Sequence, residues 1–334
     1  MSMQILKQDI KNKEIRNLYL FYGQEEFLKK YYLNAIEKII INEQFREMNK
    51  VVLEGKVSLS RLADVCETVP LFSERKLVLA KNTGLFKTGS KEAASGKDSD
   101  MDFFKKIPTF TCLVFYEEEI DKRLKIVNAV KNNGLIVEFE YQNSTELVKW
   151  VIKVFNTYNK KISEELAAQL VNYCEPAMTD ILNEINKIIL YMGDRKVANA
   201  NDLEQVCTKS IKSKIFDLTD AISEKNSTRA LKLLNDMVLL KEPIPKIIFM
   251  IARQFRLILE MKLMLNDKVN IKTVASKLKI HPFIAGKIAN QAKRLSTDTL
   301  KKALERTYEL DGDIKTGKIN DRIAVELLIA EFCK

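Results

Sequence analysis

The segment Asn17–Ile41 limits the possible folds of this chain more than any other, because it joins a short strand, a glycine turn and an amphipathic helix. Leu18–Tyr22 is apolar or aromatic throughout, which is typical of a strand buried on both faces. Gly23 lies in the turn, and apolar residues then recur at helical spacing from Phe27 to Ile40. This order predicts the unit that carries the phosphate-binding loop in P-loop proteins.

The loop itself lacks most of the residues that bind phosphate. The pattern G-x-x-x-x-G-K followed by Ser or Thr requires glycines, because only there can backbone N–H groups wrap a phosphate, and a hydroxyl that holds magnesium. Gly23 and Lys29 fit the pattern, but Leu28 replaces the second glycine and Lys30 replaces the hydroxyl residue. We therefore expect a degenerate P-loop that binds no nucleotide, and no cofactor.

Strands and helices alternate in the first part of the chain, and only helices are predicted after Tyr141. The predicted strands are Leu18–Tyr22, Lys50–Leu53, Lys76–Ala80, Thr111–Tyr116 and Leu135–Phe139. This alternation predicts a parallel, doubly wound sheet for residues 1–140. We expect a small helical domain at 141–210 and a helical bundle at 211–334. The predicted fold class is α/β plus all-α.

Polar residues that precede the amphipathic runs are predicted to cap the helices. Ser58, Asp121, Ser144 and Ser163 occupy such positions. The segment Lys87–Asp100 has no periodicity and consists mainly of Gly, Ser, Lys, Ala and acidic residues. We expect it to be a mobile surface loop that carries no chemistry.

Composition excludes several classes of protein. The chain has 334 residues with five widely spaced cysteines and one histidine. No Cys-x-x-Cys pair occurs, so neither a disulfide framework nor a metal site is expected, and a reducing cytoplasm fits best. No apolar run approaches the length of a membrane span, so no membrane association is expected.

The net charge of +10 is concentrated in the last third of the chain. Residues 211–334 carry 24 Lys and Arg against 15 Asp and Glu, an excess of +9. This predicts an acidic partner near that region, with nucleic acid as the first candidate; solvated lysines are the alternative. Arg253 and Arg256 lie three residues apart on one helical face. They could contact phosphates, or form ion pairs between bundle helices or subunits.

No catalytic constellation is recognisable. Glu117–Glu119 follows a strand, but three adjacent glutamates at the start of a loop are interpreted as solvated. Gly312–Lys318 matches the first seven positions of a P-loop, yet no strand precedes it, so Gly317 is interpreted as a helix stop. His281 precedes a proline at a helix start and is interpreted as a capping or surface residue. We expect no catalytic site.

An apolar group lies in the predicted loop between the helix that Ser58 caps and the third strand. Val69, Leu71 and Phe72 surround Pro70, and the polar segment Ser73–Arg75 follows. An apolar pair such as Leu71 and Phe72 at the entrance to a strand usually packs in the core. Alternatively, the proline stiffens a tip that presents one aliphatic and one aromatic side chain to a pocket on another protein.

Four segments in this order resemble the family of bacterial DNA polymerase III delta subunits, and the likeness runs over essentially the whole chain. They are Tyr19–Leu28, Pro70–Val78, Ile120–Arg123 and Phe216–Leu218. The resemblance implies an AAA+-type domain, a helical lid and an oligomerising helical collar, which would correspond to 1–140, 141–210 and 211–334.

The resemblance also implies a function. A delta subunit joins the gamma/tau and delta prime subunits of the clamp loader, binds the beta sliding clamp and opens its ring on primed DNA, without hydrolysing ATP. The clamp-binding tip would be Val69, Leu71 and Phe72. Two alternatives stay open from the residues alone: an active AAA+ ATPase, and a free-standing DNA-binding protein that uses its basic last third.

Overall fold

The structure is a computed structural model that describes residues 2–88, 101–278 and 280–333. The chain divides into two compact units, a sheet unit at 1–141 and a helical unit at 142–334. Most of the segment Lys87–Asp100, which was predicted to be a mobile loop, lies outside the described residues. In the described ranges, no helix is both long enough and apolar enough to cross a membrane.

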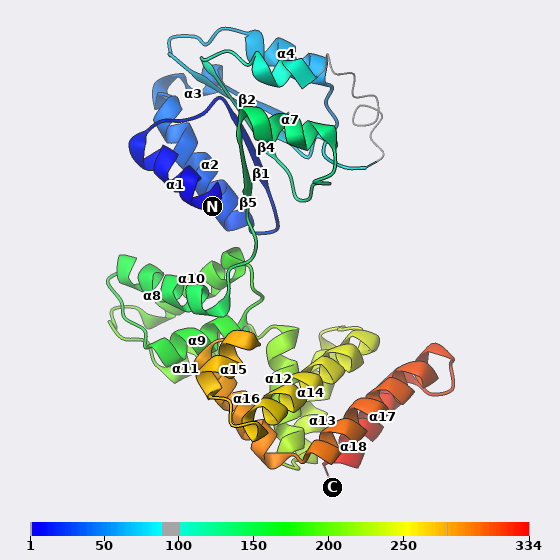
Figure 1. Ribbon diagram of the computed structural model, residues 1–334. Helices are drawn as coiled ribbons and strands as arrows, with labels where there is room; N and C mark the ends of the chain where they lie inside the picture. The colour runs from blue at the N-terminus through cyan, green and yellow to red at the C-terminus, as the bar shows by residue number, and fades with distance from the viewer. Residues whose placement is uncertain (1, 89–100, 279, 334) are drawn as a thin grey trace. The chain divides into compact units, whose positions relative to one another are not determined.

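The sheet unit contains five parallel strands in the order β2-β3-β4-β1-β5 (Figure 1). The strands are β1 Leu18–Tyr22, β2 Lys50–Glu54, β3 Lys76–Lys81, β4 Thr111–Tyr116 and β5 Leu135–Glu138. All five were predicted. β1 lies between β4 and β5. The strands that follow β1 in the sequence are therefore added on both sides of it, and the strand order reverses at β1. Ligands of open parallel sheets bind beyond the carboxyl ends of the strands at such a point.

Helices cover both faces of the sheet. The described helices and turns of this unit are α1 Ser2–Asn12, α2 Glu26–Ile40, η1 Glu43–Phe45, α3 Arg46–Asn49, α4 Leu59–Glu67, η2 Asp102–Lys105 and α7 Lys125–Asn133. Alternate residues of each strand enter two separate cores. Tyr19 and Phe21 pack with α1 and α2, whereas Leu18 and Leu20 pack with α4 and α7. The sequence did not predict α1.

Two of the four predicted helix caps are wrong. Ser58 and Ser163 accept hydrogen bonds from N–H groups in the first turns of α4 and of α9 (Glu164–Tyr173), as predicted. Asp121 does not cap a helix, because α7 begins four residues later, and its carboxylate instead accepts hydrogen bonds from Arg123. The cap of α8 (Ser144–Thr157) is Asn143, one residue before Ser144.

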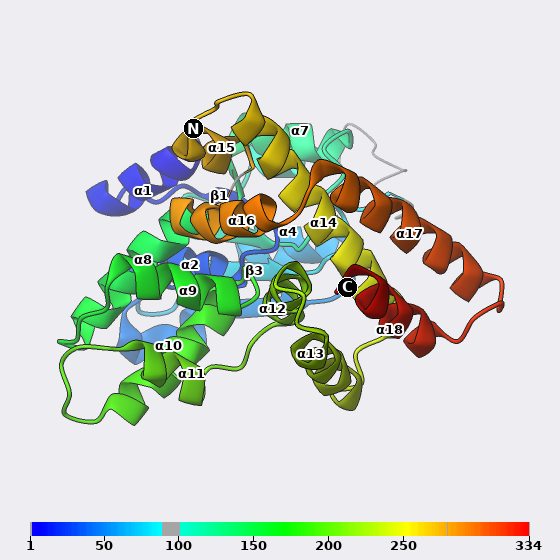
Figure 2. The ribbon, with the colours of Figure 1, turned by 90° about the horizontal axis from the view of Figure 1, so that it is seen from below.

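The helical unit contains α8 Ser144–Thr157, α9 Glu164–Tyr173, α10 Met178–Met192, α11 Ala200–Val206, α12 Ile211–Ser223, α13 Ser227–Leu239, α14 Ile244–Asn266, α15 Ile271–Lys277, α16 Pro282–Arg294, α17 Thr297–Lys315 and α18 Asp321–Phe332. The long helix α14 packs against α12, α16 and α17 (Figure 2). Its buried residues, such as Ile251 and Phe255, lie in one large core with residues of α12–α18. The α/β plus all-α class is therefore confirmed, while the boundary near residue 210 stays a prediction.

Candidate functional site

The loop between α4 and β3 presents the three apolar residues that were singled out from the sequence. Val69, Leu71 and Phe72 have 67%, 55% and 78% of their surfaces exposed. The alternative that Leu71 and Phe72 pack in the core is therefore wrong. We call residues 69–72 the tip.

The loop that carries the tip is fixed at its C-terminal side. The Arg75 guanidinium donates hydrogen bonds to the carbonyl oxygen of Ile15 at 2.6 Å and to the side-chain oxygen of Asn17 at 2.9 Å. The Ser73 hydroxyl donates to the carbonyl oxygen of Arg75 at 3.0 Å. Because these bonds join the loop to the segment before β1, the tip projects from a rigid base.

A pocket of about 560 Å³ lies at the carboxyl ends of the strands, where a nucleotide would bind in a P-loop protein. Its lining includes Gly23, Lys29, Lys30, Asn82 and Glu117. The loop after β3 offers Asn82 rather than a carboxylate. In the described part of the chain, no group of three or more His, Cys, Asp or Glu side chains is placed to hold a metal ion.

Lys29 is buried in this pocket and already has partners of its own. Its Nζ lies 2.6 Å from Oε1 of Glu26 and donates a hydrogen bond to the carbonyl oxygen of Glu117 at 3.1 Å. It also lies 4.6 Å from the ring centre of Tyr116, whose hydroxyl donates to Oε2 of Glu26 at 2.7 Å. The ammonium group that would hold a phosphate thus holds an internal carboxylate.

The ionisation of Glu26 follows from the same contacts. Partial burial disfavours the carboxylate, but the hydrogen bonds from Lys29 and Tyr116 outweigh that effect and lower the pKa of Glu26. Burial, together with the bond to Glu26, raises the pKa of the Tyr116 hydroxyl. Glu26 is therefore a stable anion that stays beside Lys29 at neutral pH.

The backbone of the glycine turn is also engaged. The N–H of Gly23 donates to the carbonyl oxygen of Glu118 at 3.0 Å, and the N–H of Glu25 donates to that of Phe139 at 3.0 Å. The Glu25 carboxylate accepts a hydrogen bond from the N–H of Phe27 at 3.1 Å and caps α2. These N–H groups point to protein acceptors, and Leu28 fills the position of the second glycine.

Glu117 corrects the interpretation that Glu117–Glu119 is solvated. Glu118 and Glu119 are exposed, but Glu117 is buried, and its Oε1 accepts hydrogen bonds from the N–H and the hydroxyl of Thr83 at 2.8 and 2.6 Å. Burial raises the pKa of this carboxyl group. No feature of the sequence indicates that Thr83 would donate hydrogen bonds to Glu117.

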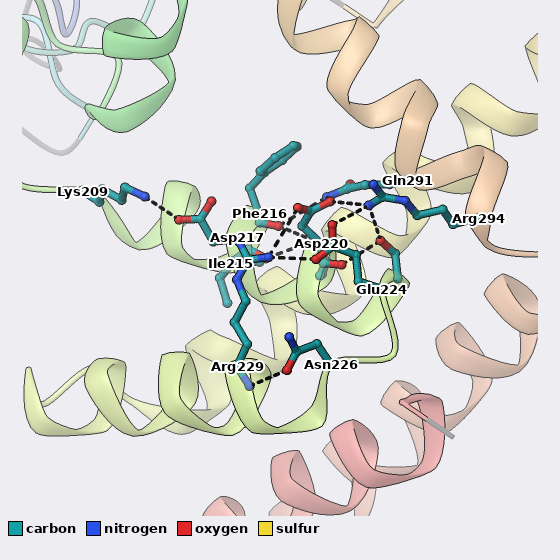
Figure 3. Close-up of polar contacts among 12 residues, drawn as sticks. Lys209, Ile215, Phe216, Asp217, Asp220, Glu224, Asn226, Arg229, Gln291 and Arg294 are labelled. Carbon is teal, nitrogen blue, oxygen red and sulfur yellow. Dashed lines mark hydrogen bonds and ion pairs between the residues drawn. The ribbon is translucent and has the colours of Figure 1, made fainter. Parts of the chain in front are cut away.

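Arginines in the helical unit fall into two groups. Arg229 and Arg294 form ion pairs with Asp220 and Glu224 of α12, which join α12 to α13 and α16 (Figure 3). These arginines therefore have partners within the bundle. The network also includes Gln291, whose side-chain amide donates to Asp220 at 3.4 Å.

Arg253 and Arg256 on α14 belong to the second group. Both are exposed, and neither forms an ion pair with another described residue. The alternative of ion pairs between helices of the bundle is therefore wrong within the described ranges. Phe249, one turn before Arg253, has 67% of its surface exposed. The face of α14 thus combines two cations with an aromatic ring.

Two further residues behave as helix-terminus residues. His281 is buried rather than on the surface, and its Nδ1 accepts a hydrogen bond from the N–H of Phe283 at 3.2 Å, so it caps α16. Gly317 follows the end of α17 with φ +71°, as expected for a helix stop.

Two models of protein families match the chain. The model of the DNA polymerase III delta subunit matches residues 19–140, and the model of the C-terminal domain of that subunit matches residues 212–332. The first range includes the degenerate loop and the tip, and the second includes α14.

Individual relatives agree with these models. The chain is 29% identical to DNA polymerase III subunit delta of Bacillus subtilis (strain 168), over 98% of this chain and 96% of that protein. Among solved structures, it is similar to the DNA clamp loader delta protein of Bacillus subtilis, with 26% identity, a TM-score of 0.55, and 100% of this chain and 99% of that chain covered.

Proposed function

This chain belongs to the family of DNA polymerase III delta subunits, which are clamp-loader components of the polymerase holoenzyme, and we propose that it binds the beta sliding clamp and opens its ring. The observation that carries this proposal is the tip. Leu71 and Phe72 are exposed on a loop with a rigid base, and they form the kind of anchor that fills an apolar pocket on a partner.

Burial of the tip would supply the binding free energy. Fully burying a leucine or phenylalanine side chain contributes about 1.5–3 kcal/mol. Binding alone does not open a ring, because a ligand shifts an equilibrium only by its difference in affinity for the two states. We therefore propose that the rest of the sheet unit contacts a second surface of the clamp that is available only in the open ring.

The pocket at Lys29 supports a subunit that does not hydrolyse ATP. Lys29 is paired with Glu26, Leu28 fills the place of a glycine, and no carboxylate follows β3. An active ATPase would need a free lysine, a hydroxyl for magnesium and that carboxylate. The alternative of an active AAA+ ATPase is thus disfavoured. A titration with a fluorescent ATP analogue, expected to show no binding, tests it.

The remaining proposed partners are the gamma/tau and delta prime subunits and primed DNA. We propose that the helical unit forms the collar that joins the other subunits, as the sequence resemblance implied. Arg253 and Arg256 are available for phosphates, because both are exposed and neither forms an ion pair with another described residue. A replication subunit of this kind would act in the cytoplasm.

The decisive experiment measures binding of the purified protein to the sliding clamp of the same organism, without ATP. Leu71→Ala combined with Phe72→Ala should weaken binding at least about 100-fold, since two buried anchors are lost. Tyr31→Ala is a matched control, because Tyr31 is also an exposed aromatic residue of the sheet unit. Normal binding by the double variant would remove the tip from the proposal.

The same assay separates the proposal from the free-standing DNA-binding alternative. That alternative predicts tight, strongly salt-dependent DNA binding by the isolated chain and no binding to the clamp. A clamp-loader subunit should instead bind the clamp alone and bind DNA weakly until it is assembled.

A further inference from the structure

A single buried side chain holds the backbone of the tip. The Asn49 amide at the end of α3 accepts a hydrogen bond from the N–H of Leu71 at 2.8 Å and donates one to the carbonyl oxygen of Leu71 at 2.7 Å. It also donates to the carbonyl oxygen of Phe45 at 3.1 Å. Both backbone groups of the anchor residue are thus fixed by a residue 22 positions earlier in the chain.

The next residue of the tip is held in an unusual conformation. Phe72 has φ +53°, in the left-handed region that non-glycine residues rarely adopt. Such strain persists only where the surrounding structure determines the conformation, and it occurs most often at binding sites. Because Asn49 fixes the backbone of Leu71, it also fixes the residue that immediately precedes Phe72 and its left-handed conformation.

An aromatic ring from another segment supports Phe72. The ring centres of Phe45 and Phe72 are 5.5 Å apart, with the planes inclined by 31°. Phe45 is half-buried and Met48, in the same short segment, is exposed. The apolar surface around the tip therefore continues onto η1 and α3.

The short helix α3 is itself tied to the sheet unit. The buried carboxylate of Glu37 on α2 forms ion pairs with Arg46, the first residue of α3, and with Lys50, which follows its last residue; the distance to Lys50 is 2.7 Å. Both ends of α3 are thus held. Asn49 therefore acts on the tip from a fixed position.

We propose that Asn49 is a positioning residue for clamp binding, and that Phe45 completes the apolar surface that the clamp contacts. This inference rests on the proposed clamp-binding function. Asn49 holds Leu71 and Phe72 in the bound conformation before the clamp arrives, so less conformational entropy is lost on binding. Without its amide, the tip would have to become ordered during the encounter.

The test compares Asn49→Ala and Asn49→Asp with wild type in the clamp-binding assay. Asn49→Asp keeps the size of the side chain but places a carboxylate against two carbonyl oxygens. Both variants should bind roughly tenfold more weakly, since an ordered loop is replaced by a flexible one. Phe45→Ala should weaken binding in the same direction.

Thr83→Val is the control for a general loss of stability. It removes a buried hydroxyl of the same unit, at the opposite end of β3 from the tip. It should leave clamp affinity unchanged. If Asn49→Ala binds like wild type, or if Thr83→Val is equally impaired, the positioning role is wrong.

Amide hydrogen exchange supplies a readout that needs no clamp. The N–H of Leu71 should exchange faster in Asn49→Ala than in wild type, whereas amides in the middle of β3 should not change. Unchanged exchange at Leu71 would overturn the inference even where Asn49→Ala binds the clamp more weakly than wild type. Failure of wild type to bind the clamp would contradict the proposed function instead, and the exchange result would still decide whether Asn49 orders the tip.

Discussion

The Nζ of Lys29 lies 2.6 Å from the carboxylate of Glu26, three residues earlier on the same helix. In a P-loop protein the equivalent lysine reaches the phosphates of the nucleotide. Here a side chain of the chain itself supplies the anion, and the N–H groups of the turn donate to backbone carbonyl oxygens. The architecture of the nucleotide site is therefore retained as a structural element.

Lys29 should accordingly affect stability rather than nucleotide binding. Lys29→Ala leaves the Glu26 carboxylate and the Glu117 carbonyl oxygen without this partner, which should lower the free energy of unfolding by about 2 kcal/mol. Denaturant unfolding measures the effect. Lys30→Ala is the control, because Lys30 is exposed and acts on Glu26 only through its charge, and it should change stability little. Equal stability of both variants would show that the Lys29 pair is dispensable.

Gly23 should tolerate no side chain. Its φ is +117°, and a Cβ there would lie 2.3 Å from the carbonyl oxygen of Phe139. Gly23→Ala should therefore cost more than about 3 kcal/mol of unfolding free energy, through strain and a displaced β5. Gly55→Ala is the matched control: φ is +85°, but nothing lies within 4 Å, so only the backbone cost of about 1 kcal/mol applies. Similar losses at both positions would contradict the steric argument.

The sheet could be predicted from the sequence because its strands are continuous apolar runs, as in Leu18–Tyr22. The helix α1 was missed, because Ser2–Asn12 has few apolar residues and is held by packing of Leu6 in the core. Asp121 was taken as a cap because a polar residue precedes an apolar run, yet its carboxylate bonds to Arg123 in a turn before α7.

The residues of the candidate site also differ in how well the sequence predicts them. Leu71 and Phe72 could be found because Pro70 and a polar segment flank them in the sequence. The Glu26 pair carries a weak signal, since glutamate and lysine three apart lie on one helical face. Asn49 carries none, because its bonds to Leu71 exist only after α3 and the loop have come together.

The ion pairs of Glu37 predict a dependence of stability on pH. Burial disfavours this carboxylate, but hydrogen bonds from Lys50 and Arg46 outweigh that effect and lower the pKa of Glu37 below its ordinary value of 4.5. A lowered pKa stabilises the folded state above the unfolded pKa, and this stabilisation is lost as the pH falls. Glu37→Gln should be about 1 kcal/mol less stable than wild type at pH 7.

The difference between wild type and Glu37→Gln should begin to shrink as the pH falls below about 4.5, where the carboxylate of the unfolded chain becomes protonated, and should disappear once the pH falls through the lowered pKa of the folded state. Urea unfolding at several pH values measures it. Glu47→Gln is the control, because Glu47 lies on α3 next to Arg46 but is exposed, and its effect should be small at every pH. A constant difference for Glu37→Gln between neutral and acidic pH would show that these ion pairs do not stabilise the fold.

Arg253 and Arg256 should contribute to DNA binding by the assembled loader. Each phosphate contact releases counterions, so the slope of log affinity against log salt measures the number of contacts. Arg253→Gln with Arg256→Gln should reduce the size of this slope by roughly 1–2, because two cations are lost. Lys301→Gln with Lys302→Gln makes the same change in charge at exposed positions of α17 and should leave the slope unchanged. If the arginines face a neighbouring subunit instead, the double variant will weaken assembly while the assembled fraction keeps the wild-type slope.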